Sequence, residues 1–469
     1  MINFRAPLTE FDPSIFRAYD IRGRVPEQLN TQTLYWLGRI IGHVIGLDNS
    51  APVVVGCDGR VSSPDLKKAL VCGLRESGRD VIDIGFAPTP LINYTAANLA
   101  HNNAIAVTAS HNPANQNGLK ITIGGKALMD DEIAQLASLL DQPLTTGAGR
   151  LTEQSQIANY SYQLCRKIPL MRRWKLVVDS GNGIAGPLAK AVFERQGLIV
   201  IPLFDTVDGS FPNHSPDPCV EANLEQLKKR VVSHSADLGI AFDGDGDRVV
   251  IVDENGEVLA ADHLLVILAQ AALERTPEGT VLFDAKCSSV VEELIQTAGG
   301  TPLMGRTGHS PMKRLMKTSS AIFGGELSAH YYDADWYGFD DAIYTACRLM
   351  ERLEQLQTTA ALVKLGIPKR DATPEYRIEL TAQQHQQLDS QLGSFAFACD
   401  AIDQTDGVRL RYPDGWALAR LSNTELALVL RYEGHNRLAL ERIIEHTNNQ
   451  LRHIEASLTL PDASSLNTL

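Results

Sequence analysis

The stretch Leu238-Gly-Ile-Ala-Phe-Asp-Gly-Asp-Gly-Asp-Arg-Val-Val-Ile-Val252 is the part of the chain that says most about its fold. Two short apolar runs flank the loop Asp243–Arg248, which carries three carboxylates on alternate positions. Such flanks predict a strand, a tight loop and a second strand. At an effective dielectric near 20, each pair of these acids about 5 Å apart costs roughly 3 kcal/mol. A divalent cation would reverse that sign, and oxygen-only ligands favour Mg²⁺, Ca²⁺ or Mn²⁺ over zinc.

Two other interpretations of this loop are weaker. Asp243, Asp245 and Asp247 fit the first, third and fifth positions of an EF-hand, and Glu254 fits its last. The sharp turn of an EF-hand requires glycine where this chain has Arg248, and the flanks are β-like rather than helical. A solvated acidic turn would explain the glycines but not the arginine, which suits an anion beside a metal.

Strand-like and helix-like segments alternate through most of the chain. Val53–Gly56 is a short β run, Ser63 is expected to cap a helix with Pro64 at its first position, and Val81–Ile84 is the next strand. This order predicts α/β domains with parallel or mixed sheets. Polar loops repeatedly follow the strands, where α/β folds place their ligands. These loops begin at Ala109, Ser180, Ala285 and Gly324.

Length and charge bound the function. The 469 residues predict roughly three or four domains. A net charge of −13 argues against nucleic acid and against an anionic membrane as partners. The seven cysteines are scattered without a C-x-x-C pair, and the N-terminal segment lacks a signal-peptide core. We therefore expect a cytoplasmic globular protein.

The loop Thr108–Pro113 follows a predicted strand and contains Ser110. Serine, asparagine and proline are common turn residues, so the loop alone proves little. His111 lies beside the serine, and a turn expected at Asn117-Gly118 would bring Lys120 back toward it. The loop lacks the Gly-x-Ser-x-Gly pattern of esterases, and a serine associated with a metal favours phosphoryl transfer.

Five motifs, taken together and in order, resemble those of the α-D-phosphohexomutases. Thr108–Pro113 is similar to their active-serine loop, and Asp243–Arg248 is similar to their metal loop. Gly325–His330 resembles their sugar-binding loop and Arg420–Thr424 their phosphate-binding loop. Phe16–Gly23 resembles the N-terminal segment of the bacterial phosphomannomutase/phosphoglucomutase branch.

The resemblance implies four domains around a central cleft, each of which gives one loop. Three similar mixed-sheet α/β domains and a C-terminal α+β domain are expected. The active-serine loop would lie in residues 1–150, the metal loop in 151–255, the sugar loop in 256–368 and the phosphate loop in 369–469.

The resemblance also implies roles for individual residues. Ser110 would carry a phosphoryl group, and one Mg²⁺ would be held by Asp243, Asp245 and Asp247 with an oxygen of the phosphorylated serine. The reaction centre would include Ser110, His111, Lys120, His309 and Arg22, with Lys120 and His309 as candidates for the general base. The substrate would be bound by Tyr19, Arg248, Lys286, Glu326, Ser328, His330, Arg420, Ser422, Asn423 and Thr424.

One position departs from the family pattern. Ala329 stands where the family usually has glycine, and alanine does not adopt positive φ cheaply. The backbone of the sugar loop is therefore expected to differ. Leu327 resembles the glucose/mannose branch, because the glucosamine branch typically has glutamine there.

The implied activity is reversible conversion of hexose 1-phosphate and hexose 6-phosphate, of mannose or glucose or both. It would proceed through phosphorylated Ser110 and a glucose or mannose 1,6-bisphosphate, acting in a monomer, with a dimer left open. Three alternatives remain: a phosphoglucosamine mutase, a serine-dependent metallophosphatase, and a non-catalytic sugar-phosphate sensor. The sensor is disfavoured because it needs neither Ser110 nor three aspartates.

Overall fold

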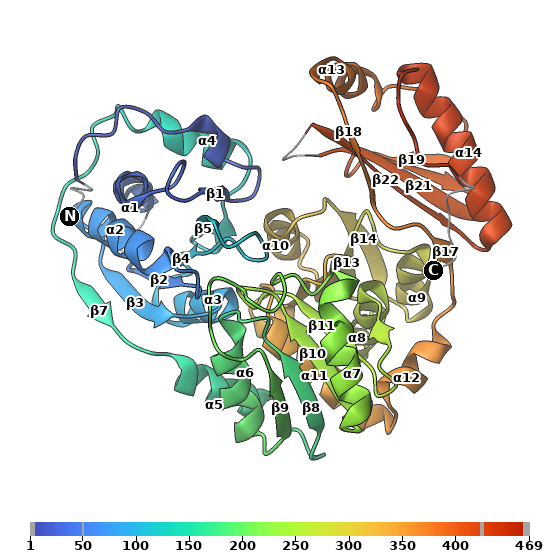
Figure 1. Ribbon diagram of the computed structural model, residues 1–469, viewed down its shortest axis with the longest axis horizontal. Coiled ribbons are helices and arrows are strands. Elements are labelled where there is room, and N and C mark those ends of the chain that lie inside the picture. The colour runs from blue at the N-terminus through green and yellow to red at the C-terminus, as the bar shows by residue number, and fades with distance from the viewer. Residues whose placement is uncertain (1–4, 49–50, 423–425, 463–469) are drawn as a thin grey trace.

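The computed structural model describes residues 5–48, 51–422 and 426–462, which form four β-sheets (Figure 1). In this view the first and last sheets stand on opposite sides, and the two middle sheets lie between and below them. The first three sheets contain both parallel and antiparallel pairs, and the fourth is antiparallel throughout. The expected architecture, three mixed-sheet α/β domains followed by an α+β domain, is confirmed.

The first sheet is built on the predicted β–α–β unit. Strand β2, Val53–Cys57, leads through helix α2, Ser63–Glu76, to β3, Val81–Phe86. The helix cap is Ser62, one residue before the predicted Ser63. The sheet order is β1-β5-β4-β2-β3-β7 with β6 beside β5. Its other elements are β1 Ile21–Arg24, β4 Ala104–Val107, β5 Gln116–Ile123, β6 Lys126–Ala127, β7 Leu151–Glu153, α1 Thr31–Asp48, α3 Thr89–Leu99, α4 Asp131–Ser138 and the 3₁₀ turn η1 Pro13–Ile15.

The turn expected at Asn117-Gly118 is wrong, because both residues lie in strand β5. This strand runs antiparallel to β4 and places Lys120 opposite Ala106. A Cβ at Gly118 would lie 2.1 Å from the carbonyl oxygen of Ile21, so only glycine allows β1 to approach β5 this closely. Antiparallel pairing, rather than a tight turn, returns Lys120 toward the serine loop.

The metal-loop stretch folds as predicted. Strand β10, Leu238–Phe242, and strand β11, Val249–Val252, form an antiparallel pair joined by the loop Asp243–Arg248. The second sheet has the order β12-β11-β10-β8-β9. Its other elements are β8 Lys175–Asp179, β9 Ile199–Leu203, β12 Val258–Leu259, α5 Ile157–Lys167, α6 Ala185–Arg195, α7 Glu225–Ser233 and η2 Glu221–Leu224.

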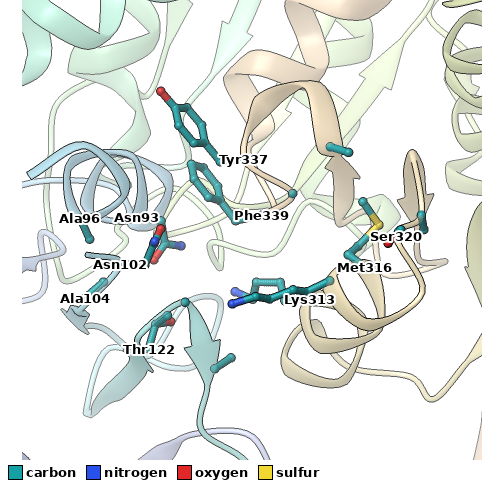
Figure 2. A pocket seen from close by; sticks show the side chains of 16 residues that line it. Asn93, Ala96, Asn102, Ala104, Thr122, Lys313, Met316, Ser320, Tyr337 and Phe339 are labelled. Atoms are coloured by element: carbon teal, nitrogen blue, oxygen red, sulfur yellow. The ribbon is translucent and has the colours of Figure 1, made fainter. Parts of the chain in front are cut away.

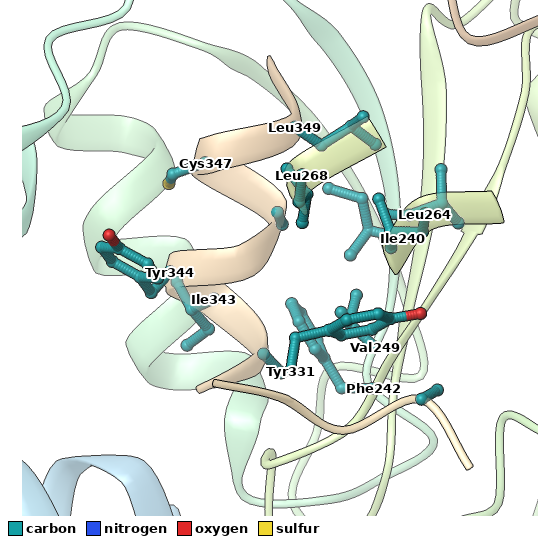
Figure 3. Close-up of a cluster of buried hydrophobic side chains, with 14 of the residues drawn as sticks. Ile240, Phe242, Val249, Leu264, Leu268, Tyr331, Ile343, Tyr344, Cys347 and Leu349 are labelled. Carbon is teal, nitrogen blue, oxygen red and sulfur yellow. The ribbon is translucent and has the colours of Figure 1, made fainter. Parts of the chain in front are cut away.

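The second and third domains share one hydrophobic core. Helix α8, Ala261–Arg275, and helix α11, Ala342–Leu356, pack their apolar faces against β10 and β11 (Figure 3). This packing connects the domain of the metal loop to the domain of the sugar loop. The third sheet has the order β14-β13-β15-β16. Its elements are β13 Thr280–Asp284, β14 Thr301–Gly305, β15 Phe323–Gly325, β16 Tyr331–Asp333, α9 Ser289–Thr297, α10 His309–Thr318, α12 Ala360–Val363, η3 Ala334–Trp336 and η4 Lys364–Gly366.

The fourth domain has a hydrophobic core of its own. Its sheet follows the order β17-β22-β21-β20-β19, with β18 also beside β22. Its elements are β17 Asp371–Ala372, β18 Tyr376–Glu379, β19 Ala401–Asp403, β20 Val408–Tyr412, β21 Gly415–Leu421, β22 Ala427–Gly434, α13 Ala382–Gln391 and α14 Arg437–Ile454.

Two short strands lie just past the expected domain limits at residues 150 and 255. Strand β7 pairs with β3 of the first sheet, and β12 pairs with β11 of the second. We therefore place these two limits slightly later than the sequence suggests. Among the residues that the structure describes, no helix combines the length and apolar character needed to cross a bilayer.

Candidate active site

Ser110 lies in the loop that follows β4 and is buried. Its backbone φ is +50°, in the left-handed region that non-glycine residues rarely adopt. Its Oγ donates a hydrogen bond of 2.6 Å to Oδ2 of Asp243 and lies 3.3 Å from Nδ1 of His111. Strained backbone of this kind persists only where neighbours hold it, and such sites gather around function.

The neighbours that hold this loop are Asp58 and Arg60, which were not singled out from the sequence. The buried guanidinium of Arg60 donates to the carbonyl oxygens of Ser110, Asn112, Pro113 and Gln116 at 2.6–3.1 Å. Asp58 receives Arg60 Nε at 3.1 Å and the hydroxyl of Thr108 at 2.7 Å. Both residues follow strand β2, so the rule that polar loops after strands carry ligands could have found them.

The metal loop winds around Asp243. Its Oδ1 accepts backbone N–H groups of Gly246, Asp247 and Arg248 at 2.9–3.1 Å. A Cβ at Gly244 would lie 2.4 Å from the carbonyl oxygen of Ser110, so glycine permits the two loops to meet. Burial, together with the carboxylates of Asp245 and Asp247, raises the pKa of Asp243 well above its usual value.

The other two acids of this loop are paired with Lys120. Its Nζ lies 2.7 Å from Oδ2 of Asp245 and 2.5 Å from Oδ2 of Asp247, and Thr89 donates to the former at 2.5 Å. Oδ1 of Asp245 and Oδ1 of Asp247 are buried without a hydrogen-bond partner. Ligand atoms of the three aspartates lie within 4.8 Å of one another. Buried oxygens gathered around one point, two of them unpartnered, fit a divalent metal ion.

His330 joins the metal loop to the sugar loop. Arg248 Nε donates to His330 Nε2 at 2.9 Å, so the remaining ring proton belongs on Nδ1. That nitrogen lies 3.0 Å from Oδ2 of Asp340, whose Oδ1 lies 3.0 Å from Nζ of Lys313. Asp340 and Lys313 carry no local motif, so only the fold reveals that they orient His330.

Glu326 is fully buried at the start of the sugar loop. Its Oε1 accepts the N–H of Gly308 at 2.6 Å, and its Oε2 accepts the hydroxyl of Tyr332 at 2.6 Å. Burial raises the pKa of this carboxyl. Ala329 does adopt φ of +67°, donating its N–H to the carbonyl of Glu326 at 3.0 Å. The chain thus accepts a left-handed alanine rather than a different turn.

A cavity of about 1240 Å³ brings together predicted residues from all four expected domains. It is lined by Tyr19, Arg22, His111, Arg248, Lys286, His309, Glu326, Ser328, His330 and Arg420. Ser110, Lys120 and the three aspartates are buried behind these residues, and Ser422 is half-buried outside the lining. Asn423 and Thr424 lie outside the described residues. The full lining holds seven arginine and lysine side chains against four carboxylates, a positive balance that suits an anionic ligand.

Two histidines in this region are neutral at pH 7. The positive charge of Arg248, followed by burial, keeps the pKa of His111 well below its usual value. Burial, followed by the charge of Lys313, does the same for the pKa of His309. Arg22 donates to the side-chain oxygen of Asn112 at 2.6 Å, beside the serine. A neutral imidazole can accept a proton, whereas this arginine can only donate.

A second cavity, of about 480 Å³, opens between the first and third domains (Figure 2). Lys313 points into it from α10, and Tyr337 and Phe339 stack above it with ring centroids 5.8 Å apart. None of the residues predicted from the sequence lines this cavity. The larger cavity is therefore the candidate active site.

Comparison with known families matches the chain along most of its length. Residues 13–144, 158–256 and 260–368 match the first, second and third α/β/α domains of phosphoglucomutase/phosphomannomutase, and residues 375–450 match the C-terminal domain. The phosphomannomutase/phosphoglucomutase of Pseudomonas aeruginosa is 41% identical over 456 residues, covering 96% of this chain and 97% of that protein. A phosphoglucomutase of Neisseria meningitidis is 35% identical over 436 residues, covering 92% and 95%.

A solved structure shows the same architecture. A phosphoglucomutase/phosphomannomutase family protein from Burkholderia thailandensis superposes with a TM-score of 0.90 at 37% identity, covering 96% of this chain and all of that one. Identity and coverage of this size show that the two chains share one four-domain architecture.

Proposed function

The chain belongs to the phosphoglucomutase/phosphomannomutase family, and from that premise we propose that it interconverts hexose 1-phosphates and hexose 6-phosphates. Mannose and glucose phosphates are the substrates proposed. One observation carries the proposal. The buried hydroxyl of Ser110 lies 2.6 Å from Asp243, one of the three clustered aspartates, and adjoins a cavity lined by arginine and lysine side chains.

The chemistry is a phosphoryl transfer in two matched halves. The O6 hydroxyl of a hexose 1-phosphate attacks phosphorus on phosphorylated Ser110, the bond to Oγ breaks, and a 1,6-bisphosphate forms. After the sugar turns around, Ser110 Oγ attacks the phosphorus at C1 and hexose 6-phosphate leaves. Each attacking hydroxyl gives its proton to a base, for which His309 is the candidate, and each leaving oxygen takes a proton up. Lys120 was also expected as a base, but burial, which lowers its pKa, is outweighed by Asp245 and Asp247, which raise it, so in this arrangement its ammonium can only donate.

The metal would be held by Asp243, Asp245 and Asp247, with an oxygen of the phosphorylated serine. The oxygen-only donor set fits Mg²⁺, Ca²⁺ and Mn²⁺, and we propose Mg²⁺ because the family resemblance implies it. When bound it offsets the negative charge of the transferring group. His111, whose Nδ1 lies 3.3 Å from Ser110 Oγ, and Arg22, which donates to Asn112 in the same loop, are proposed to orient that group.

The sugar must fit in two orientations, so the residues that bind it are proposed to lie away from the three metal-binding aspartates. Glu326 and Ser328 would hold two ring hydroxyls, and His330 would assist them. Arg420 and Ser422 would bind the phosphate that does not react, with Asn423 and Thr424 beside them. The substrate-binding surface would be completed by Tyr19, Arg248 and Lys286. A grip on the 3- and 4-hydroxyls ignores C2, where glucose and mannose differ.

All residues of this proposal come from one chain, so we propose that a monomer acts, with a dimer left open. Glucose 1,6-bisphosphate or mannose 1,6-bisphosphate would keep Ser110 phosphorylated. The glucosamine alternative would need a different contact near Leu327.

A coupled assay tests the proposal directly. The purified chain, given Mg²⁺ and a trace of glucose 1,6-bisphosphate, is offered glucose 1-phosphate, mannose 1-phosphate and glucosamine 1-phosphate in turn. Turnover of the first two, its loss in Ser110→Ala, and a raised KM in Arg420→Ala are expected. Ser161→Ala, on a buried serine of α5 that donates to the carbonyl of Ala158 and lies outside the cavity lining, is the control. Near-full turnover in Ser110→Ala, or preference for the glucosamine ester, would overturn the proposal.

A further inference from the structure

Lys286 occupies a tight turn that both the third and fourth domains hold. Within the third domain, Cys287 N–H donates to the carbonyl of Asp284 at 3.0 Å, which closes the turn around the lysine. Asp284 is buried, and its carboxylate also receives the N–H of Leu327 at 3.1 Å and the hydroxyl of Thr307 at 3.2 Å. The turn is thus tied to the sugar loop on its own side.

Arg409, from strand β20 of the fourth domain, holds the other side of this turn. Its Nη1 donates to the carbonyl oxygen of Ala285 at 3.2 Å, and its Nη2 donates to that of Cys287 at 3.0 Å. These carbonyls belong to the two residues that flank Lys286 in the chain. The planar fork of an arginine fits two such acceptors at once, which a lysine cannot do.

The guanidinium is itself fixed in place. Arg409 is 2% exposed and stacks on the ring of Trp416 at 4.0 Å. Trp416 Nε1 donates to Glu433 at 2.9 Å, and that carboxylate also accepts the N–H of Ser289 at the start of α9. A buried, stacked cation between two domains has little freedom, so it transmits position from one to the other.

The same strand also reaches the expected phosphate loop. Asp406, just before β20, accepts the N–H of Thr307 at 3.1 Å and lies 3.7 Å from Nε of Arg420. Lys286 Nζ lies 3.2 Å from Glu375 of the fourth domain. The start of β20 therefore lies next to both Lys286 and Arg420, two cations that line the cavity.

We propose that Arg409 is a positioning residue that sets the place of Lys286 relative to Arg420, so that both cations meet one sugar phosphate together. It touches no substrate itself and acts through the backbone on both sides of Lys286. The kinetic part of this inference rests on the proposed function, but the placement of Lys286 does not.

Two variants and one control test it. Arg409→Met removes both donors, and Arg409→Lys keeps the charge but not the fork. The control is Arg411→Gln, on the same face of the same strand, whose guanidinium pairs with Glu292 at 3.0 Å and does not touch the turn. Each protein is assayed for KM and kcat with glucose 1-phosphate, and the acetylation rate of Lys286 by acetic anhydride is followed by peptide mass spectrometry.

Both Arg409 variants are expected to raise KM on the order of tenfold with a smaller change in kcat, because a displaced anchor weakens binding. Lys286 should acetylate several-fold faster than in the wild type, while Arg411→Gln matches the wild type in both measurements. Wild-type KM and acetylation in Arg409→Lys would overturn the proposal, even if Arg409→Met fails to fold. If the wild type shows no mutase turnover, the acetylation rates still decide the placement of Lys286.

Discussion

Arg60→Lys is the substitution that should reveal most about the serine loop. The arginine donates to four backbone carbonyls of that loop and to Asp58, five acceptors in all. An ammonium has three donors at a single point, so at least two acceptors lose their partner. Of the four carbonyls, only that of Ser110 is paired in a buried hydrogen bond; those of Asn112, Pro113 and Gln116 are part-buried, and Pro113 also accepts the N–H of Gln116. We therefore expect a loss of about 1–3 kcal/mol, the cost of one buried carbonyl left unpaired, against about 5–15 kcal/mol for the stability of an ordinary domain.

The assay is urea denaturation followed by circular dichroism, with kcat measured on the same preparations. We expect a lower midpoint for Arg60→Lys and a fall in kcat of at least about tenfold, since Ser110 loses its support. Arg75→Lys is the control, because Arg75 Nε makes one hydrogen bond in the same domain, to Gly149 at 2.8 Å. If Arg60→Lys unfolds at the same urea concentration as the control and keeps full kcat, the reasoning about this loop is refuted.

Four further substitutions probe the metal-binding aspartates, the sugar loop and His214. Asp243→Asn should lower Mg²⁺ affinity by about tenfold or more in calorimetric titration. Unchanged affinity would mean that Asp243 is not a metal ligand. Glu326→Gln should raise KM for glucose 1-phosphate about tenfold. Tyr332→Phe, which removes one hydrogen bond to Glu326, should raise KM less. Equal KM values for the two variants would contradict this prediction. Burial alone would lower the pKa of His214, but hydrogen bonds to Asp179 and Ser215 outweigh it and raise the pKa. The stability that the protonated His214 adds is present below pH 6.5 and is lost as pH rises through the folded-state pKa. His214→Asn should therefore destabilise the protein more at pH 5.5 than at pH 8.5. A loss of melting temperature that does not depend on pH would be inconsistent with this account.

The sequence predicted those parts of the fold that are specified by residues close together in the chain. The apolar flanks and glycines of 238–252 specify a hairpin by themselves, and the hairpin is present. The serine loop also follows its strand as expected. Asn117-Gly118 misled because an Asn-Gly pair usually makes a turn, whereas here the close approach of β1 requires glycine inside a strand. Tertiary contact outweighed the local preference.

The residues that support the site were not predictable in the same way. Arg60, Asp340 and Arg409 act on segments far away in the chain, and nothing in their own neighbourhood reveals the partner. Their partners are backbone carbonyls or buried side chains that only the folded chain brings near. Ala329 shows the reverse case: its residue type predicted a loop that avoids positive φ, but the buried alanine adopts the left-handed backbone nonetheless.

The central claim is that Ser110 carries the transferred phosphoryl group. The protein is incubated with ³²P-labelled glucose 1,6-bisphosphate, and the labelled peptide is mapped. The account predicts one label per chain, on Ser110, which passes to sugar when unlabelled glucose 6-phosphate is added and which never appears in Ser110→Ala. A protein that isomerises glucose 1-phosphate at full rate while this serine stays unlabelled would contradict it.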